Sequence, residues 1–396
     1  MSPSLRFPEF TGEWEKCKLG TLATKVGSGS TPKGGDAVYT SIGHYFVRSQ
    51  NVGMGFLMLD NIAHINDDIH QKHKATEIYE NDVLLNITGA SIGRTAVATK
   101  ELEGGNVNQH VCIIRINSKV NPKFLCDYIQ TQRIQNHIKS LQTGGSREGL
   151  NFEQIRSFPI SLPSINEQNK LTCLLDKINE RIATQVRLID RLQSLIKGIN
   201  RTIFTGSGLE YSLCDVCEIR SGYSGNQLQG GKGLGVSRIE TISAHNINLE
   251  RIGYVAPFDA SENYRLQVGD ILFSNINSVE YIGNTAFIDK DYNLYHGMNL
   301  LRLIPFRNVV VPFYLYILLN TNRMLKHFKT ICNKAVSQAS INQKELGKTI
   351  VMLPSLEKQK QVCNIYQAMY SKLKTEKDVL SFYQEQKRYL LRHMFI

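Results

Sequence analysis

The sequence of 396 residues has no long hydrophobic run and no visible export signal. No segment approaches the ~18 consecutive apolar residues that a membrane helix requires. Residues 1–8 lack the basic stretch followed by an apolar stretch that marks a secretory leader. These absences predict a protein that does not enter a membrane and that stays in the cytoplasm.

The sequence also lacks the motifs of common DNA-modifying enzymes. It has no Pro-Pro dipeptide, hence no Asn-Pro-Pro-Tyr-type motif for adenine methylation, and no Pro-Asp dipeptide of the commonest nuclease motif. Gly230-Gly-Lys-Gly233 lacks the Gly-x4-Gly-Lys-Ser/Thr frame of a phosphate-binding loop. We therefore predict no catalytic residue in this chain.

Metal-binding patterns are equally scarce. The eight cysteines are scattered, and the ten histidines show no His-x3-His pair. Cys214-Asp-Val-Cys217 could form half of a zinc site, but no second pair of ligands stands at a suitable spacing. In a reducing compartment such cysteines are most simply small buried hydrophobic residues. We predict no metal site.

Basic residues, by contrast, are in excess. Lys and Arg number 46 against 35 Asp and Glu, a formal net charge of +11. A basic surface favours nucleic acid as a partner, because Lys and Arg release counterions from phosphates. The 42% hydrophobic content is that of a globular protein, and the length suits two domains of ~100–200 residues each.

The chain repeats itself once, in conserved order and at an offset of about 188 to 191 residues. Chance does not produce several matched segments in the same order. The matched segments are residues 82–87 with 270–275, the Ile-Gly pairs at 92–93 and 282–283, residues 122–125 with 312–315, 131–133 with 321–323, 160–164 with 351–355, and 201–204 with 392–395.

Each copy has a mixed domain and then a long helix. The domain alternates short β-rich runs, such as residues 111–116 and 299–304, with Gly, Ser and Asn. Short helical stretches follow at residues 124–132 and 313–319. Pro163 and Pro354 disfavour helix just before the long helical segments begin. The predicted bounds are 1–163 for domain 1, 164–208 for helix 1, 209–354 for domain 2 and 355–396 for helix 2.

Apolar residues recur every three or four positions along both long segments, which predicts helices of about 36 residues and roughly 54 Å each. So long and narrow a stripe needs another long helix, and the nearest candidate is its own repeat. We therefore predict an α+β fold of two tandem α/β domains whose helices pair as an antiparallel coiled-coil spacer. The alternative is two separate interaction helices. The stripe residues are Leu171, Leu175, Ile178, Ile182, Ile189, Leu192, Val362, Tyr366, Met369, Leu373, Leu380 and Tyr383.

Loops rich in polar residues are the predicted DNA-contacting surface, because such side chains pair with phosphates and base edges. The alternative is that these residues form turns and do not contact DNA. The two copies differ most in these loops, which predicts two different half-sequences read at a fixed separation. The candidates are Ser28, Ser30, Thr31, Lys33, Arg48, Asn86, Thr88, Arg94, Ser146 and Arg147 in copy 1, and Arg220, Tyr223, Ser224, Asn226, Arg238, Ser274, Asn275, Asn277, Lys334, Ser337 and Gln338 in copy 2.

This pattern resembles the specificity subunit of type I restriction–modification enzymes. The resemblance covers essentially the whole chain and depends on motifs that occur in duplicate. They are Asp82-Val-Leu-Leu with Ile92-Gly93, Asp270-Ile-Leu-Phe with Ile282-Gly283, the Leu-Pro-Ser…Glu-Gln segment at 162–168 and its Glu-Lys-Gln form at 353–359, and the opening Leu5-Arg-Phe-Pro-Glu-Phe-x3-Trp14.

The resemblance implies two target recognition domains, each reading half of a gapped site in double-stranded DNA. The paired helices would act as a ruler and dock two methyltransferase subunits, with two restriction subunits outside them. S-adenosylmethionine, ATP and magnesium would then belong to those partners. The competing interpretations are a methyltransferase or nuclease with unfamiliar motifs, active as an isolated chain, and a scaffold protein that does not bind DNA.

Overall fold

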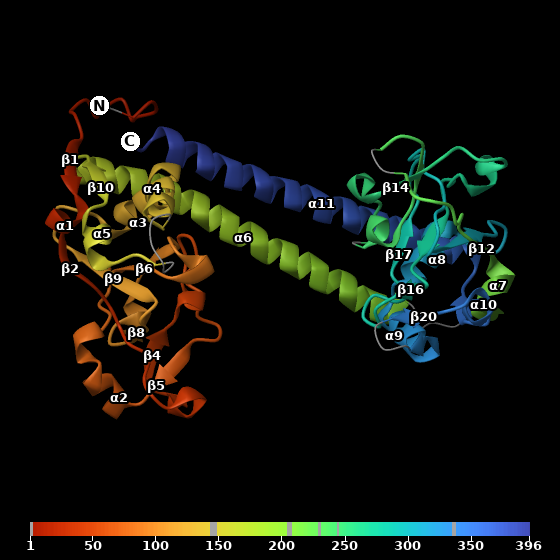
Figure 1. Ribbon diagram of the computed structural model, residues 1–396, viewed down its shortest axis with the longest axis horizontal. Coiled ribbons are helices and arrows are strands. Elements are labelled where there is room, and N and C mark those ends of the chain that lie inside the picture. Colours follow the sequence, from red (N-terminus) through yellow and green to blue (C-terminus); the bar gives the residue numbers. More distant parts are fainter. Residues whose placement is uncertain (1–2, 143–148, 204–207, 229–230, 244, 335–337) are drawn as a thin grey trace. The chain divides into compact units, whose positions relative to one another are not determined.

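The computed structural model describes all residues except 1–2, 143–148, 204–207, 229–230, 244 and 335–337. The chain divides into two compact units (Figure 1): unit 1 comprises Met1–Arg187 and Asp378–Ile396, and unit 2 comprises Leu188–Lys377. Each unit thus contains one globular domain and one half of each long helix. Within the described residues, no helix is long and apolar enough to cross a membrane.

The domain of unit 1 is built on a four-stranded antiparallel sheet in the order β2–β9–β6–β7. The side chains alternate between two cores. Val83 and Leu85 of β6 face one hydrophobic cluster, and Leu84 between them faces another. This period of two is what makes the segment a strand buried on both faces. The strands are β2 (Ala23–Ser28), β6 (Val83–Asn86), β7 (Thr95–Val97) and β9 (Val111–Ile116).

Helices cover one face of this sheet and a small second sheet covers the other. The helices α3 (Pro122–Gln130), α4 (Gln132–Gln142) and α5 (Phe152–Arg156) bury their apolar residues with Val83 and Leu85. On the other face lies the sheet β3–β5–β4–β8 with helix α2. The remaining elements are β3 (Tyr39–Thr40), β4 (His44–Val47), β5 (Ala63–Ile65), α2 (Asp67–Lys72), β8 (Asn106–Val107), α1 (Leu19–Leu22), and β1 (Glu15–Lys18) paired with β10 (Pro159–Leu162).

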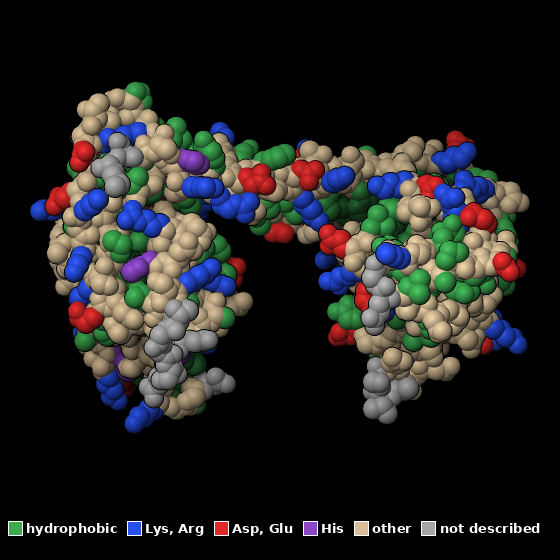
Figure 2. Space-filling view, turned by 45° about the horizontal axis from the view of Figure 1, so that its top comes forward, with side chains coloured by type: hydrophobic (Ala, Val, Ile, Leu, Met, Phe, Trp, Pro, Cys, Tyr) green, Lys and Arg blue, Asp and Glu red, His purple; other side chains and the backbone are tan. Residues whose placement is uncertain are grey.

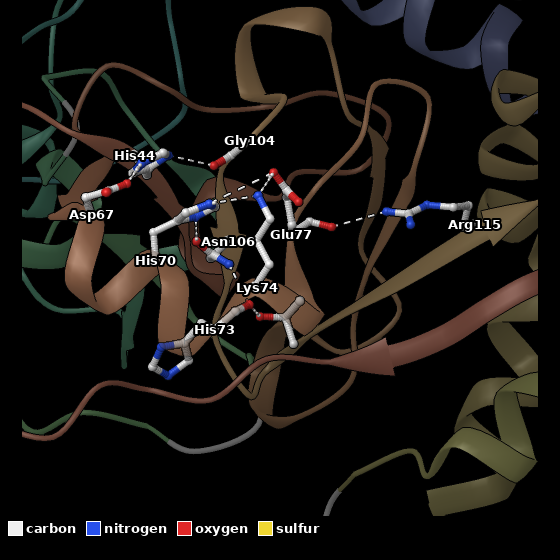
Figure 3. Close-up of polar contacts among 10 residues, drawn as sticks. His44, Asp67, His70, His73, Lys74, Glu77, Gly104, Asn106 and Arg115 are labelled. Carbon is white, nitrogen blue, oxygen red and sulfur yellow. Dashed lines mark hydrogen bonds and ion pairs between the residues drawn. The ribbon is translucent and has the colours of Figure 1, made fainter.

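A histidine network ties α2 to this small sheet (Figure 3). The rings of His44 and His70 stack with centroids 3.8 Å apart, and His70 Nδ1 lies 2.8 Å from Asn106 Oδ1. Asn106 Nδ2 donates to the carbonyl of His73 at 2.9 Å. His44 bridges Gly104 O at 2.9 Å and Asp67 Oδ1 at 3.1 Å. These contacts join two strands and a helix that are each too short to be stable alone.

The domain of unit 2 repeats the same plan, with the sheet order β12–β18–β15–β17. In both units an arginine of the central strand pairs with the aspartate before the neighbouring strand: Arg302 with Asp270 at 2.6 Å, and Arg115 with Asp82 at 2.7 Å. The two arginines stand at different register positions. The elements are β11 (Leu209–Ser212), α7 (Leu213–Val216), β12 (Cys217–Ser221), β13 (Leu234–Val236), β14 (Gly253–Val255), β15 (Ile271–Phe273), β16 (Ile276–Asn277), β17 (Thr285–Phe287), β18 (Leu301–Pro305), α8 (Pro312–Leu319), α9 (Asn322–Ile331), β19 (Asn333–Lys334), β20 (Ala339–Ser340), α10 (Gln343–Gly347) and β21 (Ile350–Leu353).

The long helices are α6 (Ile165–Ile203) and α11 (Leu356–His393), and they pack together (Figure 1). In unit 1, Leu171 shares a core cluster with Leu391, while the guanidinium of Arg181 lies 5.9 Å from the ring centroid of Tyr383. Rising numbers in α6 therefore meet falling numbers in α11, so the pairing is antiparallel, as the sequence predicts. Two separate interaction helices are not what the chain forms.

The predicted stripe faces inward along both helices. Seven of its residues are buried, and the other five are half-buried. The buried ones are Leu171, Leu175, Ile178, Ile189, Val362, Tyr366 and Leu373, and the half-buried ones are Ile182, Leu192, Met369, Leu380 and Tyr383. Since these side chains, here called the seam residues, are covered within the chain, they do not form an outward docking surface. Leu171 and Leu175 also belong to the core cluster of the unit 1 domain.

The residues of the opening motif converge on the start of α6. Arg6 donates to both carboxylate oxygens of Glu167 at 2.7 Å, and Trp14 Nε1 donates to the same carboxylate at 3.3 Å. The backbone N–H of Leu5 reaches the carbonyl of His393 at 2.9 Å. The N-terminal segment thus joins the beginning of α6 to the end of α11.

Candidate nucleic-acid interface

Several of the predicted loops of unit 1 emerge at one end of the β2–β9–β6–β7 sheet. Ser28 at the end of β2 pairs with Cys112, and Asn86 at the end of β6 pairs with Val111 at the start of β9. The loops after Ser28, after Asn86 and before Val111 therefore begin side by side. A bridge between Thr88 and Gly149 brings in the loop before α5.

A chain of hydrogen bonds joins three of these loops. The Thr31 hydroxyl donates to Gln109 Oε1, Gln109 Nε2 lies 3.1 Å from His110 Nε2, and His110 Nδ1 lies 2.5 Å from Thr88 Oγ1. Gly29 permits the close approach: a Cβ there would lie 1.7 Å from the carbonyl oxygen of Val107. The sequence prediction did not include Gln109 and His110, which lie just before β9.

The other predicted residues of unit 1 differ in how far their side chains are exposed. Asn86 is fully buried, and its Nδ2 donates to the carbonyl of Ser49 at 2.8 Å. Its side chain therefore holds two loops together, and the expectation of an exposed contact is wrong for this residue. The guanidinium of Arg48 lies 5.5 Å from the ring centroid of Tyr39. Ser30, Thr31, Lys33 and Arg94 are exposed, Ser28, Arg48 and Thr88 are half-buried, and Ser146 and Arg147 lie outside the described residues.

In unit 2 the equivalent loops meet at the same end of the equivalent sheet. Tyr223 N donates to His296 O at 2.9 Å, and Gly222 passes so close to Gly297 O that a Cβ would lie 1.9 Å away. Asn275 joins the loop after β15 to Ile341 through a backbone bond of 2.9 Å. The loops differ in sequence, but their attachment to the sheet is the same.

Some predicted residues of unit 2 are internal. Ser274 is fully buried, and its Oγ accepts from Asn277 Nδ2 at 3.0 Å, so it is not an exposed contact as predicted. The ring of Tyr223 stacks on Phe258 at 3.6 Å. The exposed candidates are Arg220, Ser224, Asn226, Arg238, Lys334 and Gln338, the half-buried ones are Tyr223, Asn275 and Asn277, and Ser337 lies outside the described residues.

Charges at the loop ends are partly compensated. Arg220 donates to both oxygens of Glu218 at 2.7 and 2.9 Å, whereas the Arg94 guanidinium has no partner among the described residues. Burial lowers the pKa of His296 to about 4, and its Nε2–H donates to the carbonyl of Leu300 at 3.0 Å. Lys and Arg side chains are spread over the faces of both units drawn in Figure 2. Within the described part of the chain, no group of three or more His, Cys, Asp or Glu side chains is arranged so that it could hold a metal ion. The loop ends thus offer hydrogen-bonding groups and positive charge.

Comparison with known proteins identifies one family. The family described as "Type I restriction modification DNA specificity domain" matches the chain twice, over residues 11–194 and 209–381. The chain is 38% identical over 187 residues to the putative type I restriction enzyme MjaX specificity subunit of Methanocaldococcus jannaschii. It is 25% identical over 167 residues to the type I restriction enzyme EcoBI specificity subunit of Escherichia coli. These matches cover 46% and 40% of this chain but only 44% and 34% of those proteins.

Two solved structures share the fold over nearly the whole chain. The S subunit of the type I restriction–modification system from M. genitalium superposes with a TM-score of 0.62 at 17% identity, covering 100% of this chain and 99% of that one. A chain from a study of complex assembly and conformational transition of the type I R-M system has a TM-score of 0.61 at 19% identity, covering 97% of each. Because the family's domain is found in both copies and together these cover most of the chain, this protein belongs to the type I restriction–modification DNA specificity family.

Proposed function

We propose that this chain is the sequence-specificity subunit of a type I restriction–modification complex. Each domain would read one half of a gapped site in double-stranded DNA. The observation that carries this proposal is the gathering of unlike polar loops at equivalent ends of two like sheets. One scaffold with two sets of loops is what two different half-sites require, because the loops supply the base contacts and the scaffold supplies their placement.

The chain itself would be non-catalytic and would act in the cytoplasm. Two methyltransferase subunits and two restriction subunits would supply catalysis, and S-adenosylmethionine, ATP and magnesium would be bound by them. The polar groups at the loop ends are hydroxyls, amides and guanidiniums, which recognise nucleic acid without bond-making chemistry. The family to which the chain belongs supports this division of labour.

The long helices would set the distance between half-sites and dock the methyltransferase subunits. Since the seam residues are covered, docking must use the outer faces of the helices. Both helices expose large apolar side chains, and where such side chains lie next to one another they mark an interaction site. These residues are Val186, Leu188 and Leu195 on α6, and Ile365, Phe382 and Tyr389 on α11. Tyr370 of α11 is also exposed, but it lines a pocket with Phe313 and Tyr316 of domain 2.

Single-molecule sequencing of adenine methylation tests this proposal. Cells carrying the chain with its methyltransferase partner are compared with cells that carry the partner alone. We expect a gapped, two-part motif that is methylated only when the chain is present, which would reveal both half-sites together. If the partner is soluble and no methylation depends on the chain, this result would favour the scaffold interpretation over the proposed function. Methylation by the purified chain alone would instead support an enzyme with unfamiliar motifs.

A further inference from the structure

Gln109 is an exposed side chain at the loop end of unit 1 that is nevertheless held on both sides. Its Oε1 accepts from the Thr31 hydroxyl, and its Nε2 lies 3.1 Å from His110 Nε2. His110 is fixed in turn by Thr88. An amide that is oriented before its ligand arrives loses little conformational entropy on binding. This is the arrangement that base recognition favours.

The remaining hydrogen-bonding capacity of this amide fits one base. A glutamine amide has two N–H donors and an oxygen with two lone pairs. Thr31 uses one lone pair and His110 accepts from one N–H, which leaves one donor and one acceptor for a ligand. In the major groove, adenine presents N7 as an acceptor and its N6 amino group as a donor, the pattern that Gln recognises with two bonds.

Neighbouring exposed cations suit a different task. Lys33 and Arg94 are exposed at the same loop end, and Arg94 directly precedes β7. Charged side chains of this kind bind phosphates, which positions a protein on DNA without reading its sequence. The exposed cations therefore suit contacts to the DNA backbone, whereas the fixed amide of Gln109 suits a contact to a base.

The equivalent position in unit 2 has a different character. Cys112 in β9 and Leu301 in β18 occupy the same register in their sheets. Three residues before them stand Gln109 and Met298, respectively. Met298 is 38% exposed, and its side chain has no N–H or O–H to donate. The fold therefore does not require an amide at this position, and the two copies differ where readers of different half-sites should differ.

We propose that Gln109 reads an A·T pair in the half-site of the first domain, with Thr31 and His110 as its positioning residues. This inference rests on the proposed function. Loss of a two-bond base contact reduces discrimination by roughly 5- to 150-fold. Gln109→Leu should therefore relax a single A·T position of one half-site, and the other half-site should stay unchanged.

The experiment is methylation sequencing in cells that carry the methyltransferase partner and one chain variant at a time. Gln109→Glu should shift the same position towards C·G, because a carboxylate accepts from the amino group of cytosine. Thr31→Val should relax that position more weakly, since it frees the amide and removes no base contact. Gln132→Leu, an exposed glutamine on α4, serves as the matched control and should leave the motif unchanged.

The outcomes separate this inference from the proposed function. If the wild-type chain gives a gapped motif that neither Gln109 variant alters, the role of Gln109 is wrong and the function stands. Relaxation at a C·G position, or in both half-sites, also contradicts it, as does loss of all methylation with both variants. If the wild-type chain directs no methylation, the proposed function and the inference fall together.

Discussion

Gln168 and Gln359 show how single side chains fix the start of each long helix. Gln168 is fully buried, and its Nε2 donates to Pro163 O at 2.9 Å and Lys119 O at 3.1 Å. Its Oε1 accepts from Asn121 N at 2.8 Å. Gln359 makes the equivalent three contacts in unit 2. The Leu-Pro-Ser…Gln motif is therefore a joint between helix and domain.

Gln168→Leu should destabilise unit 1 by roughly 2–5 kcal/mol, because it leaves three buried polar groups without partners. Trp14 is the only tryptophan, and it lies in the core of unit 1, so urea unfolding followed by its fluorescence reports this unit. Gln359→Leu is the matched control in unit 2 and should leave the Trp14 transition in place. Equal urea midpoints for the wild type and Gln168→Leu would contradict the claim that Gln168 stabilises the junction between helix and domain.

Asp127 makes the stability of unit 1 depend on pH. It is buried in α3, and burial raises the pKa of its carboxyl to about 7, although Lys387 opposes this effect. A folded-state pKa above the unfolded value means that the folded form binds the proton more tightly. Its stabilising contribution is then complete below about pH 4 and is lost as the pH rises towards 7.

Asp127→Asn should flatten this dependence and stabilise unit 1 above pH 7. A pKa difference of about three corresponds to at most about 4 kcal/mol. The measurement is the urea midpoint of the Trp14 signal between pH 4 and pH 8. Asp378→Asn, which changes an exposed carboxylate, should retain the wild-type slope. A wild-type midpoint that rises from pH 4 to pH 7 would contradict the assignment.

At the scale of elements, the sequence predicts the parts whose apolar pattern continues over many residues or occurs twice in the chain. The helices α6 and α11 extend over more than ten turns each, so a single polar residue in line with the stripe, such as Lys387, does not hide the apolar pattern. Lys387 interrupts the stripe because its Nζ donates to Gln130 Oε1 at 3.0 Å, a contact that periodicity does not contain. The prediction did not name α4 and α9, although their apolar residues recur at helical spacing. The two-residue strand β8, by contrast, depends on its tertiary neighbours.

The candidate interface could likewise be predicted from the sequence only in part. The chemistry of the loops is visible in the sequence, but burial is not, since Asn86 and Ser274 are as polar as their exposed neighbours. The bridge formed by Gln109 depends on the close approach of the loop at Gly29 to the strand before β9. Contacts between segments about 80 residues apart have no local signal in a single sequence.

The outer face of α11 should carry part of the affinity for the methyltransferase subunit. Phe382 is 67% exposed, and an interface aromatic of this kind contributes about 2 kcal/mol, or roughly 30-fold in Kd. Phe382→Glu should weaken binding of the methyltransferase subunit by that factor in calorimetry, with the Trp14 unfolding midpoint unchanged. Ile42→Glu alters an exposed apolar residue of domain 1 and should bind normally. Equal affinities for both variants would exclude this face.

For the whole molecule, helix length is the quantity that should set the gap between half-sites. Four residues removed from each helix, 184–187 and 375–378, shorten both by about 6 Å at ~1.5 Å per residue. This corresponds to about two base pairs of DNA at ~3.4 Å each. Because the segments lie at matching positions of an antiparallel pair, the seam is shortened without a register shift.

The shortened chain should methylate a motif with the same two half-sites and a gap smaller by about two base pairs, or lose the original site entirely. Four residues also turn each helix by about 40° beyond a full turn, whereas seven residues keep the seam nearly in phase. A seven-residue deletion should therefore preserve activity better while reducing the gap by about three base pairs. An unchanged gap in both variants would show that the helices do not measure the site and would leave the spacing to the partners.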